Sequence, residues 1–154
     1  MKVEYINPFL SGACSVLEMV LGEMPVKQGL SAQPTSFTSE QCNVVCGVTG
    51  QAQGQVIYGM SLTTADKIAS HMLGEPIKTF DALAASAIAE LGNMISGGAM
   101  GQLAEAGYVC DITPPALIRG SKVEISTLNI PAIVIKLGTN MGLLSITVSL
   151  QGHK

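Results

Sequence analysis

Charged side chains are scarce in this sequence. They make up 12% of its 154 residues, whereas a typical globular domain has roughly 25%. Either a second subunit covers part of an apolar surface, or serine, threonine, asparagine and glutamine take the place of charge at the surface. The 8 basic and 11 acidic residues occur without runs. No basic stripe is present to bind a nucleic-acid backbone, so we expect no nucleic acid as a partner.

Targeting signals and long apolar runs are also missing. The opening residues MKVEYINPF contain no long apolar region followed by a small-residue cleavage site, so we expect no secretory signal and a cytoplasmic protein. The apolar segment 88–103 contains Glu90, Asn93 and Gln102, and its uncharged run is too short to cross a bilayer. Membrane insertion is therefore not expected.

Residues that bind metals or form disulfides are few. The 4 cysteines show no C-x-x-C spacing, and no histidine lies near them in the sequence, which disfavours zinc. Cys42 and Cys46 fall in an expected strand, where four residues span about 13 Å, too far for a disulfide. We interpret the cysteines as reduced core residues. The 2 histidines, His71 and His153, have no second titratable group beside them, and we expect both to be solvated.

Motifs of common enzyme classes are absent. The sequence contains no GxxxxGK[ST] phosphate loop, no GxGxxG after a strand, no GxSxG nucleophile elbow and no HExxH metal helix. The sequence has only two histidines, His71 and His153, and neither has a partner in the sequence that would suggest a Ser-His-Asp or Cys-His arrangement. We therefore do not expect a self-contained active site of these kinds.

The remaining patterns predict one α+β domain over residues 1–154, with helices covering one face of an antiparallel sheet. Capping and apolar periodicity predict helices that start at Asn7-Pro8, at Thr63 and at Asp81. Alternating and β-branched segments predict strands over 42–49, 55–62, 108–113, 122–126, 131–137 and 143–150, and an extended or edge segment over 24–41. The last strand alternates apolar residues inward with Ser145, Thr147 and Ser149 outward, so the other sheet face is expected to be wet or joined to something polar.

The longest uninterrupted helical pattern runs over residues 81–107, which contain no proline. At about 100° per residue, one stripe of this helix is apolar and is expected to face the core. The stripe consists of Ala84, Ile88, Leu91, Ile95 and Ala99.

Glu90 and Asn93 lie on the opposite side of this helix. They are three residues apart and are therefore neighbours on the helix surface. Only small residues surround them, namely Ala82, Ser86, Ala89 and Gly97. A bare helix face that carries an acid and an amide is suited to enter the cleft of another molecule, because small side chains let a partner approach closely.

The chemistry open to this pair is limited but specific. An asparagine amide can accept a hydrogen bond from a water while donating elsewhere, so it can orient that water without acting as a base. A glutamate one turn away can hold a cation. Phosphoryl hydrolysis needs mainly positioning and electrostatics, so two residues could suffice if a phosphorylated partner supplied the metal. Solvated polar residues on a helix are the plainer alternative.

Glycine is frequent around the pair. Gly92 lies inside it, and Gly97 and Gly98 follow it. Each costs roughly 0.5–1 kcal/mol of helix stability relative to alanine. These residues would allow the helix to bend near Asn93.

The Glu90 and Asn93 pair lies in the segment AIAELGNMISG at 87–97, and three other segments stand beside it: YINPF at 5–9, ITPP at 112–115 and IRG at 118–120. The first is similar to the E-x-x-N motif of the CheC/CheX/FliY family of bacterial chemotaxis phosphatases, and the other three are similar to the CheX-like members of that family. The resemblance therefore covers most of the chain. This chain carries one E-x-x-N motif, as CheX-like members do.

The resemblance implies an activity and a partner. It implies removal of phosphate from the aspartyl phosphate of a CheY-type response regulator, with Asn93 orienting the attacking water and Glu90 pairing with the regulator's lysine. It implies Mg²⁺ on the regulator and no cofactor of the chain's own. It also implies a homodimer formed through the sheets, which would agree with the low charge content.

Two other functions remain open. The chain could be a catalytically silent module that binds a receiver domain in a signalling complex. It could also be a structural dimerisation domain, in which Glu90 and Asn93 would tolerate alanine without loss in any partner assay.

Overall fold

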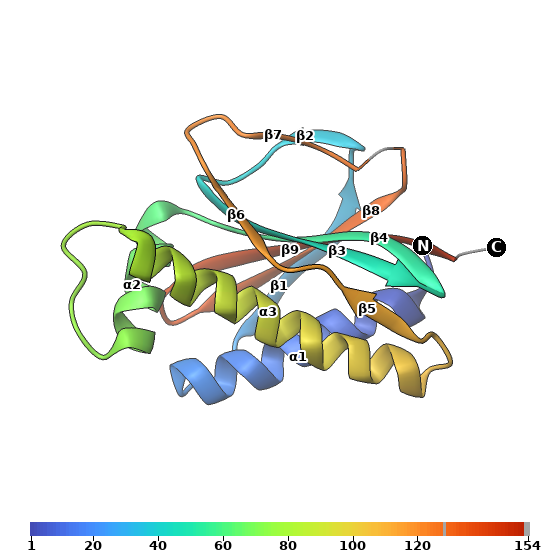
Figure 1. Cartoon of the computed structure of the whole chain (residues 1–154), viewed down its shortest axis with the longest axis horizontal. Coiled ribbons are helices and arrows are strands. Elements are labelled where there is room, and N and C mark those ends of the chain that lie inside the picture. The colour runs from blue at the N-terminus through green and yellow to red at the C-terminus, as the bar shows by residue number, and fades with distance from the viewer. Residues whose placement is uncertain (128, 153–154) are drawn as a thin grey trace.

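The computed structural model describes residues 1–127 and 129–152. In this part of the chain, three helices lie on one face of a seven-stranded sheet, and a two-stranded sheet lies on the other side (Figure 1). The helices are α1 (Val3–Leu21), α2 (Leu62–Leu73) and α3 (Ala82–Glu105). The strands are β1 (Val26–Gln33), β2 (Ser36–Thr38), β3 (Cys42–Gly50), β4 (Ala52–Met60), β5 (Cys110–Ile112), β6 (Ala116–Arg119), β7 (Glu124–Ser126), β8 (Ala132–Thr139) and β9 (Gly142–Gly152). The predicted α+β class is confirmed.

The main sheet has the strand order β1-β8-β9-β4-β3-β5, with β6 also paired to β3, and its pairs are antiparallel. Both predicted hairpins, β3–β4 and β8–β9, are present, with tighter turns than expected. The edge position of β1 agrees with the interpretation of segment 24–41. Gly54 lies within β4 rather than in the turn. Only glycine fits at this position, because a Cβ would collide with the Ser149 carbonyl of β9.

The start of α1 differs from the prediction. The helix begins at Val3 rather than at Asn7-Pro8, so Pro8 lies inside it. An interior proline costs about 3 kcal/mol, whereas burying two large side chains contributes roughly 3–6 kcal/mol. Tyr5 and Ile6 are both buried, and Tyr5 packs edge-on against Tyr108 with ring centroids 5.1 Å apart. The packing of the extra turn therefore outweighs the proline.

The start of α2 also differs. Its N-cap is Ser61, whose side chain accepts a hydrogen bond from the Thr64 N–H at 3.1 Å. The predicted start at Thr63 was wrong by two residues, because Ser61 follows directly on β4 and supplies the cap first. Gly74 ends the helix as expected, in the left-handed conformation with φ 74°.

The outer face of the main sheet, meaning the face opposite the helices, is partly covered. Ser145 is half-buried, but Thr147 and Ser149 are buried, so this part of the face is covered rather than wet, in agreement with the other expectation, a face joined to something polar. The cover is the β2–β7 sheet and the chain that follows it; the Ser149 hydroxyl donates to the Ile130 carbonyl at 3.0 Å. Strands β2 and β6 were not predicted, whereas β7 agrees with the predicted strand over 122–126.

The cysteines are reduced, as expected. Cys42, Cys46 and Cys110 are buried, and Cys14 is half-buried. His71 is exposed, and His153 lies outside the described residues. None of the helices in the described part of the chain has the length and apolarity needed to cross a membrane.

Candidate functional site

Helix α3 is anchored at its start and along its inner face. The Asp81 side chain caps it by accepting a hydrogen bond from the Ala84 N–H at 2.9 Å. Each residue of the predicted apolar stripe is buried. The stripe faces the sheet and α1, so the opposite side of α3 points away from the core (Figure 1).

Glu90 and Asn93 lie near the middle of this outward side of α3. Glu90 is exposed and Asn93 is half-buried, and their Cβ atoms are about 5–6 Å apart by helical geometry. Within residues 1–127 and 129–152, neither side chain has a hydrogen bond or ion pair. Of the small residues around them, Ala82, Ser86 and Gly97 are exposed and Ala89 is half-buried. The structure thus leaves both polar groups free for a partner.

Gly92 has a packing function that the sequence did not reveal. It is buried, and a Cβ added to it would lie 2.7 Å from Val44 Cγ1 and 3.2 Å from Tyr58 Cδ2. Glycine therefore lets α3 approach β3 and β4 at the level of Asn93. The glycines do not interrupt the helix, since α3 runs continuously from Ala82 to Glu105.

A buried hydrogen bond holds α3 one turn after Asn93. The Tyr58 hydroxyl lies 2.6 Å from Ser96 Oγ, and both residues are buried. Burial raises the pKa of the Tyr58 phenol far above its usual range, so the phenol is neutral. Burial also raises the pKa of the Cys46 thiol, and a hydrogen bond with Ser96 offsets part of that rise.

Sequence reasoning missed this contact. The available signal was two small residues, Gly92 and Ser96, four positions apart beside the apolar stripe. Small residues at core-facing positions of a helix indicate a close approach by its neighbour. Tyr58 makes that approach: its ring edge lies against Gly92 and its hydroxyl meets Ser96.

The pair consists of one acid and one amide. Among the described residues, no group of three or more His, Cys, Asp or Glu is placed to hold a metal ion. Asn93 offers an amide that can orient water, and Glu90 offers a negative charge. Fold and site together define an α+β protein that carries an acid and an amide on the outward side of its longest helix.

Comparison with known proteins identifies the family. Residues 42–138 match the family model described as chemotaxis phosphatase CheX. The CheY-P phosphatase CheX of Thermotoga maritima is 32% identical over 131 residues, which cover 84% of this chain and 84% of that protein. The chain belongs to the CheX family.

Solved structures agree with this assignment. The chemotaxis protein CheX from Desulfovibrio desulfuricans has a TM-score of 0.86 and 25% identity, over 98% of this chain and 100% of that chain. A chain of the CheX–CheY–BeF₃–Mg²⁺ complex from Borrelia burgdorferi has a TM-score of 0.84 and 27% identity, over 97% of this chain and 99% of its own. The similarity therefore extends over nearly the whole fold.

Proposed function

We propose that this chain removes the phosphoryl group from the aspartyl phosphate of a CheY-type response regulator. The observation that carries the proposal is the free Glu90 and Asn93 pair on the outward side of α3. Membership of a family whose Thermotoga maritima relative is a CheY-P phosphatase supports it. The Borrelia burgdorferi relative was crystallised with CheY, which supports a receiver domain as the partner.

Asn93 acts in this proposal by aiming a water molecule. Its amide oxygen accepts a hydrogen bond from the water, while its amide group donates to a neighbouring oxygen. The water oxygen attacks phosphorus, the bond from phosphorus to the aspartyl oxygen breaks, and phosphate, a proton and the free carboxylate result. Because an amide is not a base, Asn93 contributes orientation, and the charge on the phosphoryl oxygens must be neutralised by the partner.

The proposal assigns Mg²⁺ to the regulator and no cofactor to this chain. The crystallised complex that contains the Borrelia burgdorferi relative also contains Mg²⁺. Glu90 would pair with the regulator's lysine. An exposed ion pair is worth about 0–1 kcal/mol, but pairs that become desolvated in an interface couple more strongly, by about 1.5 kcal/mol or more. Glu90 thus contributes to the affinity and to the relative orientation of the two proteins.

The test is the decay of a phosphorylated receiver domain with and without this chain. Asn93→Ala should reduce the stimulated rate by roughly 10²-fold or more, the scale seen when one positioned transition-state group is lost. Glu105→Ala is the matched control, because Glu105 is exposed on the same helix about three turns after Asn93 and lies outside the small-residue face. Equal rates for the native chain and Asn93→Ala would overturn the proposal. Binding without any shortening of the phosphate lifetime would identify a silent receiver-binding module instead.

The oligomeric state and location form part of the same proposal. We expect residues 1–154 to act as one CheX-like domain in the cytoplasm, associated as a homodimer. Strand β1 lies at the edge of the main sheet and exposes Val26 and Leu30, at 65% and 47%. An unpaired edge with apolar side chains is a natural template for pairing with a second chain. Light scattering that gave a monomer mass at micromolar concentration would contradict the dimer.

A further inference from the structure

The outward side of α3 carries two apolar side chains besides the Glu90 and Asn93 pair. Across this helix, every residue of which the structure describes, Leu83 is the only large apolar side chain that is exposed, at 56%. Met94 is half-buried, yet within the described chain it does not pack against the hydrophobic core, whereas Met100 on the same helix does. Neither Leu83 nor Met94 therefore serves to fill the interior.

Helical geometry places both side chains on the same line as Glu90. At about 100° per residue, Leu83 is rotated around the axis by about 20° from Glu90, and Met94 by about 40°. At a rise of 1.5 Å per residue, Leu83 lies about 10 Å before Glu90 and Met94 about 6 Å after it. Met94 also follows Asn93 directly in the sequence. The two apolar side chains thus lie on either side of the acid along the helix.

The composition of this face is typical of the centre of a protein interface. Glu90 is the only charged residue of α3 before Glu105. Interface centres are depleted of charged residues and enriched in methionine, relative to the rest of a protein surface. A helix face that met only solvent would be expected to carry more charge, since charged residues make up roughly a quarter of a typical globular domain.

An interface of ordinary size that is centred on the pair includes both side chains. A specific interface buries about 800 Å² on each partner, which corresponds to a patch roughly 25–30 Å across. Leu83 and Met94 are about 16 Å apart along the helix axis. A receiver domain bound at Glu90 and Asn93 therefore covers both. Apolar groups on the receiver gain free energy when they bury these side chains, whereas polar groups there would lose their water without a hydrogen-bond partner.

We propose that Leu83 and Met94 form apolar contacts with the receiver on either side of its phosphorylation site, and that they favour receivers whose surface is apolar at these two places. The inference rests on the proposed function, which supplies the receiver as the partner. Burial of the two side chains excludes water from the groups between them. The exclusion of water strengthens the pairing of Glu90 with the receiver's lysine, because desolvated charge pairs couple more strongly than exposed ones.

The experiment measures receiver binding and receiver dephosphorylation separately. The probe is a CheY-type receiver domain, loaded with beryllofluoride and Mg²⁺ for the Kd and phosphorylated for the rate. Leu83→Ala and Met94→Ala should each raise the Kd by roughly threefold to tenfold, because less apolar surface is buried on binding. The rate at a saturating receiver concentration should change by less than about twofold, since neither side chain touches the reacting atoms and only uniform binding is lost.

Variants of similar volume test whether the contacts are apolar. Leu83→Met and Met94→Leu keep an apolar side chain and should stay within about twofold of the native Kd. Met94→Gln places a polar group at the same position and should weaken binding at least as much as Met94→Ala. Leu143→Ala is the control and should leave the Kd unchanged. Leu143 is also an exposed leucine, but it points away from the helices, since its neighbour Leu144 is buried in the core.

Failure of these contacts and failure of the proposed function give different results. If Leu83→Ala and Met94→Ala bind the receiver as Leu143→Ala does, the contacts are excluded, even where Asn93→Ala abolishes the rate. They are also excluded if the native chain does not bind the loaded receiver. A lower dimer mass by light scattering with an unchanged Kd would exclude them too, because a second copy of the chain would then cover this face. If the Kd values change as expected but the native chain does not shorten the phosphate lifetime, the proposed function fails and the contacts stand.

Discussion

The substitution Gly92→Ala tests whether the depth at which α3 packs on the sheet determines the position of Asn93. A Cβ at residue 92 would lie 2.7 Å from Val44 Cγ1 and 3.3 Å from Val44 Cβ, whereas carbon atoms in contact are normally about 3.5–4.0 Å apart. The added Cβ would therefore be roughly 1 Å too close to Val44 Cγ1. Val44 is fully buried, and its strand β3 is paired on both sides, so α3 has to move more than the valine does.

The expected magnitudes follow from this geometry. Alanine improves helix propensity by about 1 kcal/mol over glycine, but overpacking a filled core costs about 1–3 kcal/mol, so the net effect on stability is small or unfavourable. The effect on the reaction is larger. Residue 93 follows directly, and a displacement of about 1 Å in a positioned group can cost on the order of 10²-fold in rate. Gly92→Ala should therefore lose receiver dephosphorylation by more than its loss of stability explains.

The assay pairs urea unfolding with the decay of a phosphorylated receiver, at a temperature where every variant is fully folded. Gly101→Ala is the control, because Gly101 is exposed on the same helix and no atom lies within 4 Å of the position that a Cβ would take there. It should gain about 0.5–1 kcal/mol of stability and keep its rate. The double variant Gly92→Ala with Val44→Ala should recover part of the rate, because it removes the colliding methyl group. Identical behaviour of Gly92→Ala and Gly101→Ala in both measurements would refute the link between packing depth and Asn93.

Three further predictions concern neighbouring groups. Tyr58→Phe leaves Ser96 Oγ without its 2.6 Å partner and should lower the free energy of unfolding in urea by about 1–3 kcal/mol. It should also slow receiver dephosphorylation, and an unchanged rate in a folded variant would contradict a role for this hydrogen bond in positioning α3. Glu90→Ala should raise the Kd for the receiver measured by calorimetry and change the rate at saturation little, and an unchanged Kd would contradict its pairing role. Burial raises the pKa of the Cys42 thiol to about 11, so the unfolded chain loses this proton first and stability should fall as pH rises from about 9 to 11, by on the order of 1–3 kcal/mol. The pH slope should be shallower in Cys42→Ala, and identical slopes would exclude that thiol as the source.

The sequence predicted those parts of the fold that depend on local patterns. The apolar stripe of α3, its Asp81 cap and the alternation in β9 all repeat within a few residues, so periodicity and capping identify them. The same reasoning placed Glu90 and Asn93 opposite the stripe, where the structure has them. Their catalytic roles stay predictions.

The parts that were missed depend on contacts between distant segments. The first turn of α1 exists because Tyr5 packs on Tyr108, which is far away in the sequence. Strand β6 is four residues long and is defined by pairing with β3, which no local pattern encodes. Gly92 looked like a weak point because helix propensity counts only its missing side chain, whereas its function depends on Val44 and Tyr58 in the sheet.

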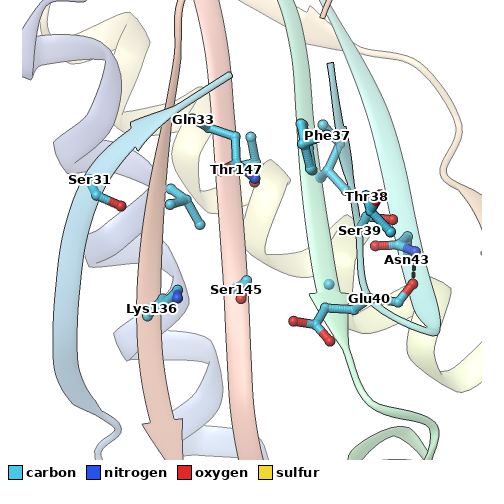
Figure 2. Close-up of a pocket in the computed structure, with 13 residues that line it drawn as sticks. Ser31, Gln33, Phe37, Thr38, Ser39, Glu40, Asn43, Lys136, Ser145 and Thr147 are labelled. Carbon is cyan, nitrogen blue, oxygen red and sulfur yellow. Dashed lines mark hydrogen bonds between the residues drawn. The ribbon is translucent and has the colours of Figure 1, made fainter. Parts of the chain in front are cut away.

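The alternation of side chains in β3 and β4 has a consequence for how the protein can change. Val44 and Tyr58 support Gly92 on the helical side, and their immediate neighbours Asn43 and Gly59 line a cavity between the main sheet and the β2–β7 sheet on the other side (Figure 2). β3 and β4 thus separate the helices from the cavity at the same level of the sheet. A mutation that shifts these two strands by a fraction of an ångström changes both the support of Gly92 and the lining of the cavity, so neither can be optimised alone.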